Sequence, residues 1–322
     1  MRVKIHGSRG SCPVAITPAR VEEITRSVWE FSHSRKLRTW NDVKKALANE
    51  RRSLSQIYGG ATTCVELTHP DFNMPIFLDL GTGFTTAGTD PDSGLNNGAF
   101  QANRGKVAIF LTHTHWDHII GLPTVEQVFR SGNEFHFYGV HKNLRDRIST
   151  LFQEEHFPVP FHAVEKSFHF HQIELGSTIE LGPFRVSHHA QVHPGGSFAY
   201  RFDDGKKVFV FATDTELRKI EAPHMNPGAN MYSDADVLLL DAQFSPEDFE
   251  TRQDYGHASI HMAVDFAVRE RTKKLYLFHQ SPTYSDDEIQ AQLERAREYL
   301  RNAHKGHPLQ IDMTVEQDTV QL

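Results

Sequence analysis

The sequence predicts an α/β protein in which strands and helices pack in layers. Short runs of apolar, β-branched and aromatic residues recur along the chain and are bounded by turn residues, as is typical of strands. Strand and helix patterns alternate between residues 236 and 300, and this order favours a layered α/β arrangement. Histidine or aspartate closes several of the apolar runs, which indicates a site at the ends of the strands.

The composition is that of a globular protein with a sizeable core. The chain has 322 residues, 39% of them hydrophobic and 23% charged, and a formal net charge of −7. This acidic balance argues against broad binding to a nucleic-acid backbone, which requires clustered Lys and Arg. Apolar runs fall short of the roughly 20 residues that span a bilayer, and residues 1–5 lack the apolar stretch of a signal peptide. We therefore expect a cytoplasmic protein that does not insert into a membrane.

Strand patterns extend through most of the chain. An Asp-Asp-Gly turn at residues 203–205 is expected to join two of the strands as a hairpin. The expected strands lie at 2–7, 63–69, 75–80, 106–112, 135–140, 168–174, 178–188, 197–203, 206–213, 236–241 and 274–279.

Helical patterns lie between and after these strands. Thr17 followed by Pro18 is typical of a helix start, and the capping-box spacing of residues 39–42 predicts a second helix. Apolar residues recur at helical period in residues 257–270 and again after Ser285, which predicts two further helices.

The remaining segments organise the chain without dividing it. Residues 88–104, rich in Gly, Asn and Asp, are expected to form an exposed loop. The two cysteines, Cys12 and Cys64, are too few for a disulfide framework or a thiolate zinc site. We interpret residues 1–322 as one domain that carries a helical insertion at about 16–57.

The most informative segment is residues 113–118, His-Thr-His-Trp-Asp-His, which directly follow an apolar run. Side chains alternate between the two faces of a strand, so His113 and His115 point the same way. Asp117 and His118 follow where the chain leaves the strand, and they can turn back toward the same point. Imidazole and carboxylate groups at this spacing predict a transition-metal site.

Three later residues occupy similar positions in the sequence. His193 lies just past a strand, Asp214 lies at the end of another, and His279 lies at the end of a third. A buried polar side chain without a partner is costly, so each should have a role. A hydrogen-bonded structural role would explain each residue alone, but together with residues 113–118 they favour additional metal ligands.

This set of residues resembles the metallo-β-lactamase superfamily, whose five motifs occur in the same order. Asp79, in the segment Phe-Leu-Asp-Leu-Gly-Thr-Gly, matches the first motif, and residues 113–118 match the second. The resemblance implies a four-layer αβ/βα sandwich with two metal ions at one edge of its two sheets. It also implies that Asp79 holds a ligand or a loop, with a turn at a strand end as the alternative. The implied ligands are His113, His115 and His193 for one ion, Asp117, His118 and His279 for the other, and Asp214 as the bridge.

Within that superfamily the chain looks closest to the phosphodiesterase and tRNase Z-like branch. Residues 7–11 (Gly-Ser-Arg-Gly-Ser) and 58–64 (Tyr-Gly-Gly-Ala-Thr-Thr-Cys) are similar to its N-terminal pattern, although about 45 helical residues separate them here. Residues 256–259, Gly-His-Ala-Ser, resemble that branch's Gly-His-Ser/Thr segment, whose histidine is associated with proton transfer. His257 is therefore a candidate general acid, with packing at a helix start as the alternative.

The implied centre favours the hydrolysis of an anionic ester. Two divalent ions bring four positive charges, of which Asp117, Asp214 and a bridging hydroxide offset three. The remaining positive charge would stabilise a phosphoryl transition state, and metal binding supplies the hydroxide near neutral pH. We therefore expect Asp117 and His257 in the catalytic centre. Zinc is the first choice of metal, with manganese or iron as alternatives.

These features predict a metal-dependent phosphodiesterase that acts on a small anionic phosphodiester, such as a cyclic nucleotide. The alternatives are a tRNase Z-like ribonuclease, a lactone or thioester hydrolase of the same fold, and a non-catalytic protein. Two basic stretches of the insertion could grip RNA, but their helical pattern makes nucleic acid the less favoured substrate. The apolar stripes of the insertion, with Trp29 or Trp40, could instead pair two copies of the chain in a homodimer. The basic residues concerned are Arg35, Lys36, Arg38, Arg51 and Arg52.

Overall fold

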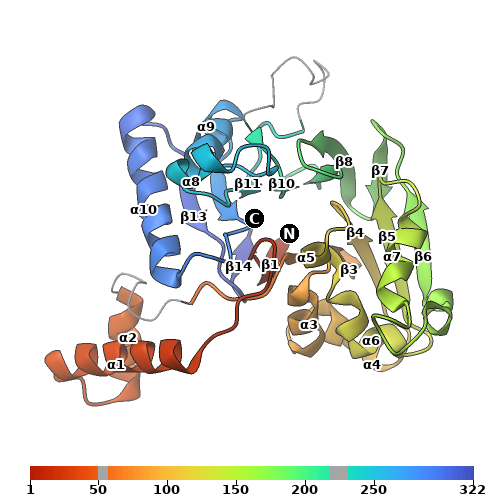
Figure 1. Ribbon diagram of the computed structural model, residues 1–322, viewed down its shortest axis with the longest axis horizontal. Helices are drawn as coiled ribbons and strands as arrows, with labels where there is room; N and C mark the ends of the chain where they lie inside the picture. The colour runs from red at the N-terminus through yellow and green to blue at the C-terminus, as the bar shows by residue number, and fades with distance from the viewer. Residues whose placement is uncertain (50–56, 218–230) are drawn as a thin grey trace.

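Two seven-stranded sheets form the centre of the molecule, which the computed structural model describes for residues 1–49, 57–217 and 231–322. Helices lie on the outer side of each sheet, and the two chain ends lie close together (Figure 1). The ends meet because the first strand pairs with the last, Val3 lying opposite Val320.

The first sheet contains strands from the N-terminal half of the chain and the last strand. β3, β4, β5 and β6 run parallel, whereas β1, β2 and β14 join the sheet through antiparallel pairs. Across the sheet the order is β14 (Thr319–Gln321), β1 (Arg2–Gly7), β2 (Cys64–His69), β3 (Phe72–Leu78), β4 (Lys106–Phe110), β5 (Glu134–Gly139) and β6 (Phe168–Gln172).

The second sheet contains strands from the C-terminal half. β10, β11, β12 and β13 run parallel, whereas β7, β8 and β9 form an antiparallel meander. Across the sheet the order is β13 (Gln310–Met313), β12 (Lys274–Phe278), β11 (Val237–Asp241), β10 (Val208–Ala212), β9 (Ser197–Asp203), β8 (Phe184–Gln191) and β7 (Thr178–Leu181).

Helices cover both outer faces of this pair of sheets. The first sheet is covered by α3 (Thr82–Thr89), α4 (Gly98–Gln101), α6 (Glu126–Phe129) and α7 (Leu144–Ser149), with α5 (Trp116–Ile119) at a strand end. The second is covered by α9 (Ile260–Arg269) and α10 (Asp286–Ala303), with α8 (Pro246–Thr251) nearby. Single 3₁₀ turns lie at Gly94–Asn96, Leu122–Thr124, Thr150–Phe152, Phe161–Ala163 and Glu165–Ser167.

The strands are apolar on both faces because each face meets a different core. In β11, Leu238 and Leu240 pack beneath the helices, while Leu239 packs between the sheets. In β4, Ile109 packs beneath the helices and Phe110 between the sheets. Continuous apolar runs are typical of parallel strands buried on both faces. The layers are therefore helix, sheet, sheet and helix, which confirms the four-layer αβ/βα sandwich implied by the resemblance.

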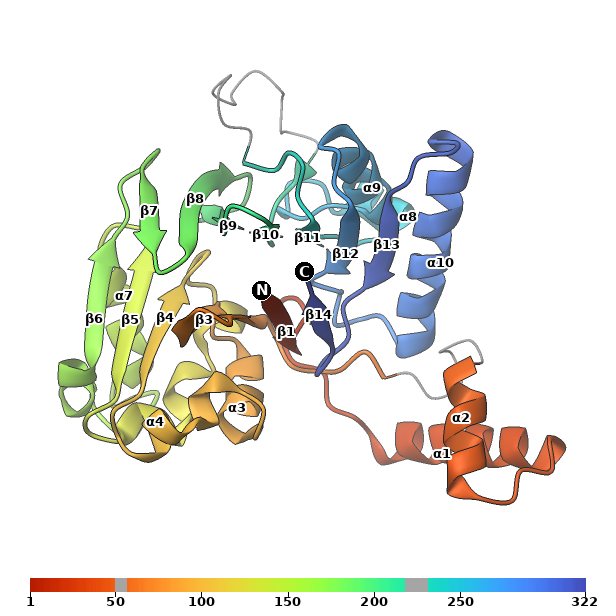
Figure 2. The same ribbon diagram turned by 180° about the vertical axis from the view of Figure 1, so that it is seen from behind.

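Two helices between β1 and β2 project from this body as an arm, the α1–α2 arm, which is visible from both sides (Figures 1 and 2). α1 (Pro18–Ser34) begins at Thr17, whose hydroxyl accepts from the backbone N–H of Arg20 at 3.2 Å. α2 (Trp40–Asn49) begins after Thr39, so both expected helices of the insertion are confirmed. Trp29 and Trp40 are 61% and 63% exposed, and dimer formation through the arm stays a prediction.

Several local expectations differ from the structure. Residues 88–104 do not form an exposed loop, because Leu95 and Phe100 are buried in a 3₁₀ turn and α4. The single strand expected at 178–188 is a hairpin of β7 and β8, which Gly182 turns at φ +58°. In the described part of the chain, every helix is too short or too polar to cross a bilayer.

Candidate metal centre

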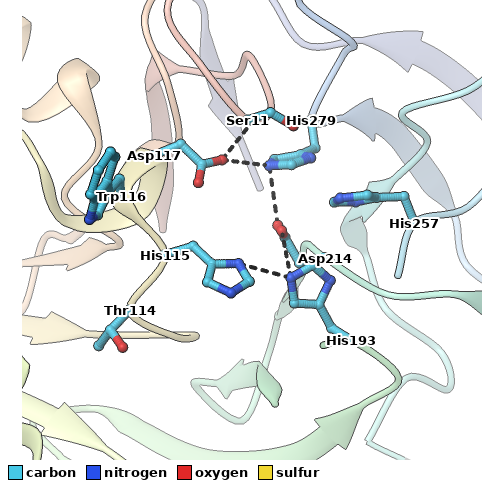
Figure 3. A pocket seen from close by; sticks show the side chains of 9 residues that line it. All are labelled: Ser11, Thr114, His115, Trp116, Asp117, His193, Asp214, His257 and His279. Carbon is cyan, nitrogen blue, oxygen red and sulfur yellow. Dashed lines mark hydrogen bonds and ion pairs between the residues drawn. The ribbon is translucent and has the colours of Figure 1, made fainter. Parts of the chain in front are cut away.

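Parallel strands bring the predicted ligands to one edge of the two sheets. The carboxyl ends of parallel strands point to the same edge. His113 follows β4 of the first sheet, Asp214 lies two residues beyond the end of β10, and His279 directly follows β12 of the second sheet. His193 reaches the same point from beyond the end of β8. Figure 3 shows His193, Asp214 and His279 converging with His115 and Asp117 on one cavity.

Three residues at this edge adopt a backbone conformation that is uncommon outside glycine. Asp79, Asp214 and His279 have φ values of 58°, 54° and 64°. Each follows the end of a parallel strand. The left-handed conformation turns the backbone away from the strand direction there and changes the direction in which the side chain points. Such backbone strain is typical of functional sites.

One group of ligands surrounds the Oδ2 atom of Asp214. His193 Nε2 lies 3.6 Å from that oxygen, and His113 Nε2 lies 3.7 Å from it. His115 Nδ1 lies 3.1 Å from His193 Nε2. Two atoms bound to one ion at about 2.1 Å in tetrahedral geometry lie roughly 3.4 Å apart. This group therefore has the spacing of a single metal site.

A second group surrounds the other carboxylate oxygen of Asp214. His118 Nε2 and His279 Nε2 lie 3.2 Å and 3.3 Å from Oδ1. The same two nitrogens lie 3.2 Å and 3.3 Å from Asp117 Oδ2. The two oxygens of Asp214 thus face two different ligand groups, which is the geometry of a bridging carboxylate.

The donor atoms in this centre fit divalent cations. His113 Nε2 is buried and forms no hydrogen bond within the described part of the chain, since it lies 3.7 Å from Asp214 Oδ2. Leaving a buried polar nitrogen unpaired is costly, so the arrangement requires a compensating partner. Imidazole nitrogens and carboxylate oxygens are the ligands of zinc, manganese and iron. A cation bound within each group would contact these buried atoms, and the one in the first group would supply the missing partner of His113 Nε2.

Outer contacts fix the orientation of the histidine rings. The carboxylate of Asp79 can only accept, so His118 donates its Nδ1–H to Asp79 at 2.8 Å and presents Nε2 to the centre. Asp79 is itself held by the backbone N–H of Thr112 at 2.8 Å and by the hydroxyl of Thr112 at 2.7 Å. His193 donates Nδ1–H to the carbonyl of Gly256 at 2.9 Å. The role implied for Asp79, holding a ligand, agrees with these contacts.

Replacing Asp79 by Asn should weaken metal binding by about 10–100-fold, because the amide places a donor against two donors. Asn tolerates the left-handed conformation of this position, so the fold should persist. Competition with a chromogenic chelator measures the affinity, and circular dichroism checks the fold. Thr112→Ser, which keeps the hydroxyl, is the matched control. Unchanged affinity in Asp79→Asn would show that Asp79 does not orient a ligand.

The electrostatics of the site favour cations at its centre. Burial alone would raise the pKa of Asp214, but the surrounding imidazoles, His118 first, hold its pKa well below the ordinary range. Burial lowers the pKa of His118, but three carboxylates led by Asp214 outweigh burial and raise its pKa well above the usual value. Burial also lowers the pKa of His113, so its imidazole is neutral near pH 7. Asp214 and His113 therefore have the forms that bind metal, an ionised carboxylate and a neutral imidazole, whereas His118 would release a proton when an ion binds.

His257 lies at the same cavity and is held by a carboxylate that the sequence analysis did not single out. Its Nδ1 donates to Asp241 Oδ2 at 2.7 Å, and its ring stacks on His279 with centroids 5.0 Å apart. Burial lowers the pKa of His257, and the charge of Asp241 outweighs burial and raises it. Figure 3 shows the His257 ring beside Asp214 and His279. This geometry suits a proton donor, although His257 also lies close enough to His193 and Asp214 to share an ion.

The cavity at the centre has a volume of about 420 Å³. All the ligands implied by the resemblance lie at or beneath it, so the structure brings the predicted site residues together. The sequence analysis missed Asp241, although it closes the apolar run of β11 and could have been found by the same signal as Asp214. It also missed Ser11, whose backbone N–H donates to Asp117 Oδ2 at 2.8 Å, and Trp116, which lines the cavity.

A four-layer sandwich with His and Asp ligands at one sheet edge defines a class of metal-dependent hydrolases. The chain belongs to the β-lactamase superfamily, since residues 93–280 match the family described as Beta-lactamase superfamily domain. The resemblance found in the sequence is thereby confirmed.

Several characterised proteins are similar to this chain in sequence or in fold. It is 26% identical over 237 residues to the ribonuclease Z of Bacillus thuringiensis (strain Al Hakam), covering 60% of this chain and 76% of the relative. Yeast PDE1 shares the fold at a TM-score of 0.66, with 12% identity and coverage of 100% of this chain and 99% of that chain. The short form of human tRNase Z shares it at 0.58, with 16% identity and coverage of 100% and 99%. The chain is thus similar in sequence to a ribonuclease Z, and similar in fold to yeast PDE1 and the short form of human tRNase Z.

Proposed function

We propose that this protein is a metal-dependent phosphodiesterase that hydrolyses a small or cyclic phosphodiester, such as a cyclic nucleotide. The observation that carries the proposal is the bridging position of Asp214, whose two oxygens face two ligand groups 3.2–3.7 Å away. A centre of two cations held by few carboxylates is net positive, so it favours an anionic substrate and the added charge of a phosphoryl transition state. The names of the relatives, which include ribonuclease Z and PDE1, support the same chemistry.

The ligands would divide between two divalent ions, with zinc the first choice and manganese or iron the alternatives. When bound, such ions lower the pKa of water toward neutrality and polarise the phosphoryl oxygens. His113, His115 and His193 would hold one ion, Asp117, His118 and His279 the other, and Asp214 both. The backbone N–H of Ser11 fixes the orientation of Asp117 by donating to its Oδ2. Asp117, Asp214 and a bridging hydroxide would offset three of the four positive charges of the ions, so the centre would keep one positive charge.

His257 would supply the proton that the leaving oxygen needs. Asp241 accepts a hydrogen bond from Nδ1 of His257 and another from the backbone N–H of Ala258. The second bond fixes the carboxylate that orients the His257 ring. The bond from Nδ1 leaves Nε2 as the nitrogen that can donate to the substrate. A general acid in this position would donate a proton to the leaving oxygen as negative charge develops on it, which contributes about 10²–10⁴-fold to the rate.

A ribonuclease that processes tRNA is the second candidate, and the α1–α2 arm favours it. Residues 18–49 carry seven Lys or Arg against four Asp or Glu, although the whole chain has a net charge of −7. Arg35, Lys36 and Arg38 are exposed on the arm, while Arg51 and Arg52 lie outside the described residues. A basic arm on an acidic body could bind an RNA backbone away from the catalytic centre.

We also propose that residues 1–322 form one domain in which residues 16–57 are an insertion. β1 and β2 are direct neighbours in the first sheet, although the whole arm separates them in the sequence. Replacing residues 16–57 by a short linker should therefore leave the metal centre intact. This variant also separates the two candidate functions.

The experiment compares the metal-loaded protein and the arm-deleted variant on three substrates: bis-p-nitrophenyl phosphate, a panel of cyclic nucleotides, and a tRNA precursor with a 3′ trailer. Hydrolysis of cyclic nucleotides that survives deletion of the arm is the expected result. Precursor cleavage that weakens steeply with salt and is lost with the arm would favour the ribonuclease. A lactone and a thioester are assayed in parallel. Turnover of either, without turnover of any diester, would overturn the proposal.

A further inference from the structure

Trp116 is 77% exposed, the highest value among the exposed large apolar side chains of the described residues. Single exposed apolar side chains are common and need no explanation by themselves. Trp116 differs because it lies between His115 and Asp117, both proposed ligands, and begins α5. Its backbone is therefore fixed by the centre. Figure 3 shows its ring at the side of the cavity, away from Asp214.

Trp116 also lines a second cavity, with a volume of about 640 Å³, which we call the Trp116 groove. Ile120, 38% exposed, and Phe157 supply further apolar surface to this groove. The Phe157 ring is held in place, since it stacks on Phe129 with centroids 6.1 Å apart and meets Phe152 edge-on at 5.9 Å. The groove thus combines the fixed ring of Phe157 with the exposed ring of Trp116, which also lines the catalytic cavity.

Polar residues that can accept hydrogen bonds also line the Trp116 groove. Glu155 and His156 line it from one loop, and Thr150 lines it from a 3₁₀ turn. The hydroxyl of Thr150 donates to a backbone carbonyl at 2.7 Å, so its oxygen remains able to accept. Adenine, guanine and cytosine have the matching chemistry, because their faces are flat and apolar while their edges carry an exocyclic amino group. An alkyl chain would use the apolar surface but not these acceptors.

We propose that the Trp116 groove binds the nucleobase of the phosphodiester while its phosphate lies at the metal centre, with Trp116 as the stacking surface. This inference rests on the proposed function, and it narrows the substrate class to nucleoside phosphodiesters. Stacking of a base on an aromatic side chain is tolerant of base identity and is a recurring means of holding single nucleotides. The position of Trp116 in both cavities accounts for how one substrate would reach both sites.

The test measures the preference for a base rather than activity alone. Two substrates are compared: adenosine 2′,3′-cyclic phosphate, and the same cyclic phosphate on methyl riboside, which has no base. The wild-type protein should prefer the adenosine substrate by about tenfold or more in kcat/KM, chiefly through KM. Trp116→Ala should lose that preference, and Trp116→Phe should keep part of it. Trp40→Ala removes an equally exposed indole from the arm and should retain the full preference.

A binding measurement keeps the inference separate from the proposed function. Adenosine 2′,3′-cyclic phosphate should quench tryptophan fluorescence in the wild type and in Trp40→Ala, but not in Trp116→Ala. If no diester is hydrolysed, the proposed function fails, yet quenching that depends on Trp116 would still support the base site. A preference that survives in Trp116→Ala, or a metal content that falls in this variant, would overturn the inference.

Discussion

Replacing Asp214 by Asn should reduce turnover of a phosphodiester by about a thousandfold or more. Residues that only support metal ligands cost about 10–100-fold when replaced, and Asp214 would contact both ions directly. Its oxygens lie 3.2–3.7 Å from four histidine nitrogens, so the amide would place a donor where an ion is expected. Bound metal should fall together with turnover. The measurements are kcat and metal content by mass spectrometry.

The fold should survive this substitution, because Asn tolerates the φ of 54° found at Asp214. Asp234→Asn is a matched control: Asp234 has a φ of 58°, but it lies at the surface and pairs with Arg271. The control should retain both its metal and its activity. Full metal content and full turnover in Asp214→Asn would contradict the bridging role.

Replacing His257 by Ala should slow turnover of a cyclic nucleotide by about 10²–10⁴-fold while leaving the metal content unchanged. An alkoxide leaving group needs a proton, whereas p-nitrophenolate does not, so turnover of bis-p-nitrophenyl phosphate should change far less. Asp241→Asn should show the same dependence on the leaving group in weaker form, because Asp241 holds the ring at 2.7 Å. His261→Ala, on α9, is the control and should behave as the wild type.

Two other outcomes would assign His257 differently. Equal losses on both substrates would remove the role of general acid. Loss of metal from His257→Ala would make His257 a ligand, in keeping with its proximity to His193 and Asp214.

The proposed ligands could be predicted from the sequence because apolar runs show where the strands end. His113, Asp214 and His279 each follow an apolar run, and the parallel strands place those ends at one edge. Asp241 ends a similar run, yet its role depends on a contact with His257, sixteen positions later, that only the folded loop creates. The sequence can therefore point to His257 and to Asp241 separately, but not to the contact between them.

Features that depend on tertiary contacts could not be predicted from the sequence. Polar turn residues in 88–104 conceal Leu95 and Phe100, which become buried only when the segment packs on the first sheet. β13 and β14 are only four and three residues long, so their alternation of polar and apolar residues is too brief to predict a strand. The Trp116 groove requires Phe157, about forty residues away, and therefore could not be inferred from the hexapeptide alone.

The most direct test of the proposed dinuclear phosphodiesterase is a metal titration of the stripped protein. Turnover of bis-p-nitrophenyl phosphate is followed as zinc, manganese or iron is added in measured equivalents. The ligand geometry around Asp214 predicts no turnover without metal and a plateau near two equivalents per chain. Turnover in the metal-free protein, a plateau at one equivalent, or no turnover with any of the three metals would contradict it.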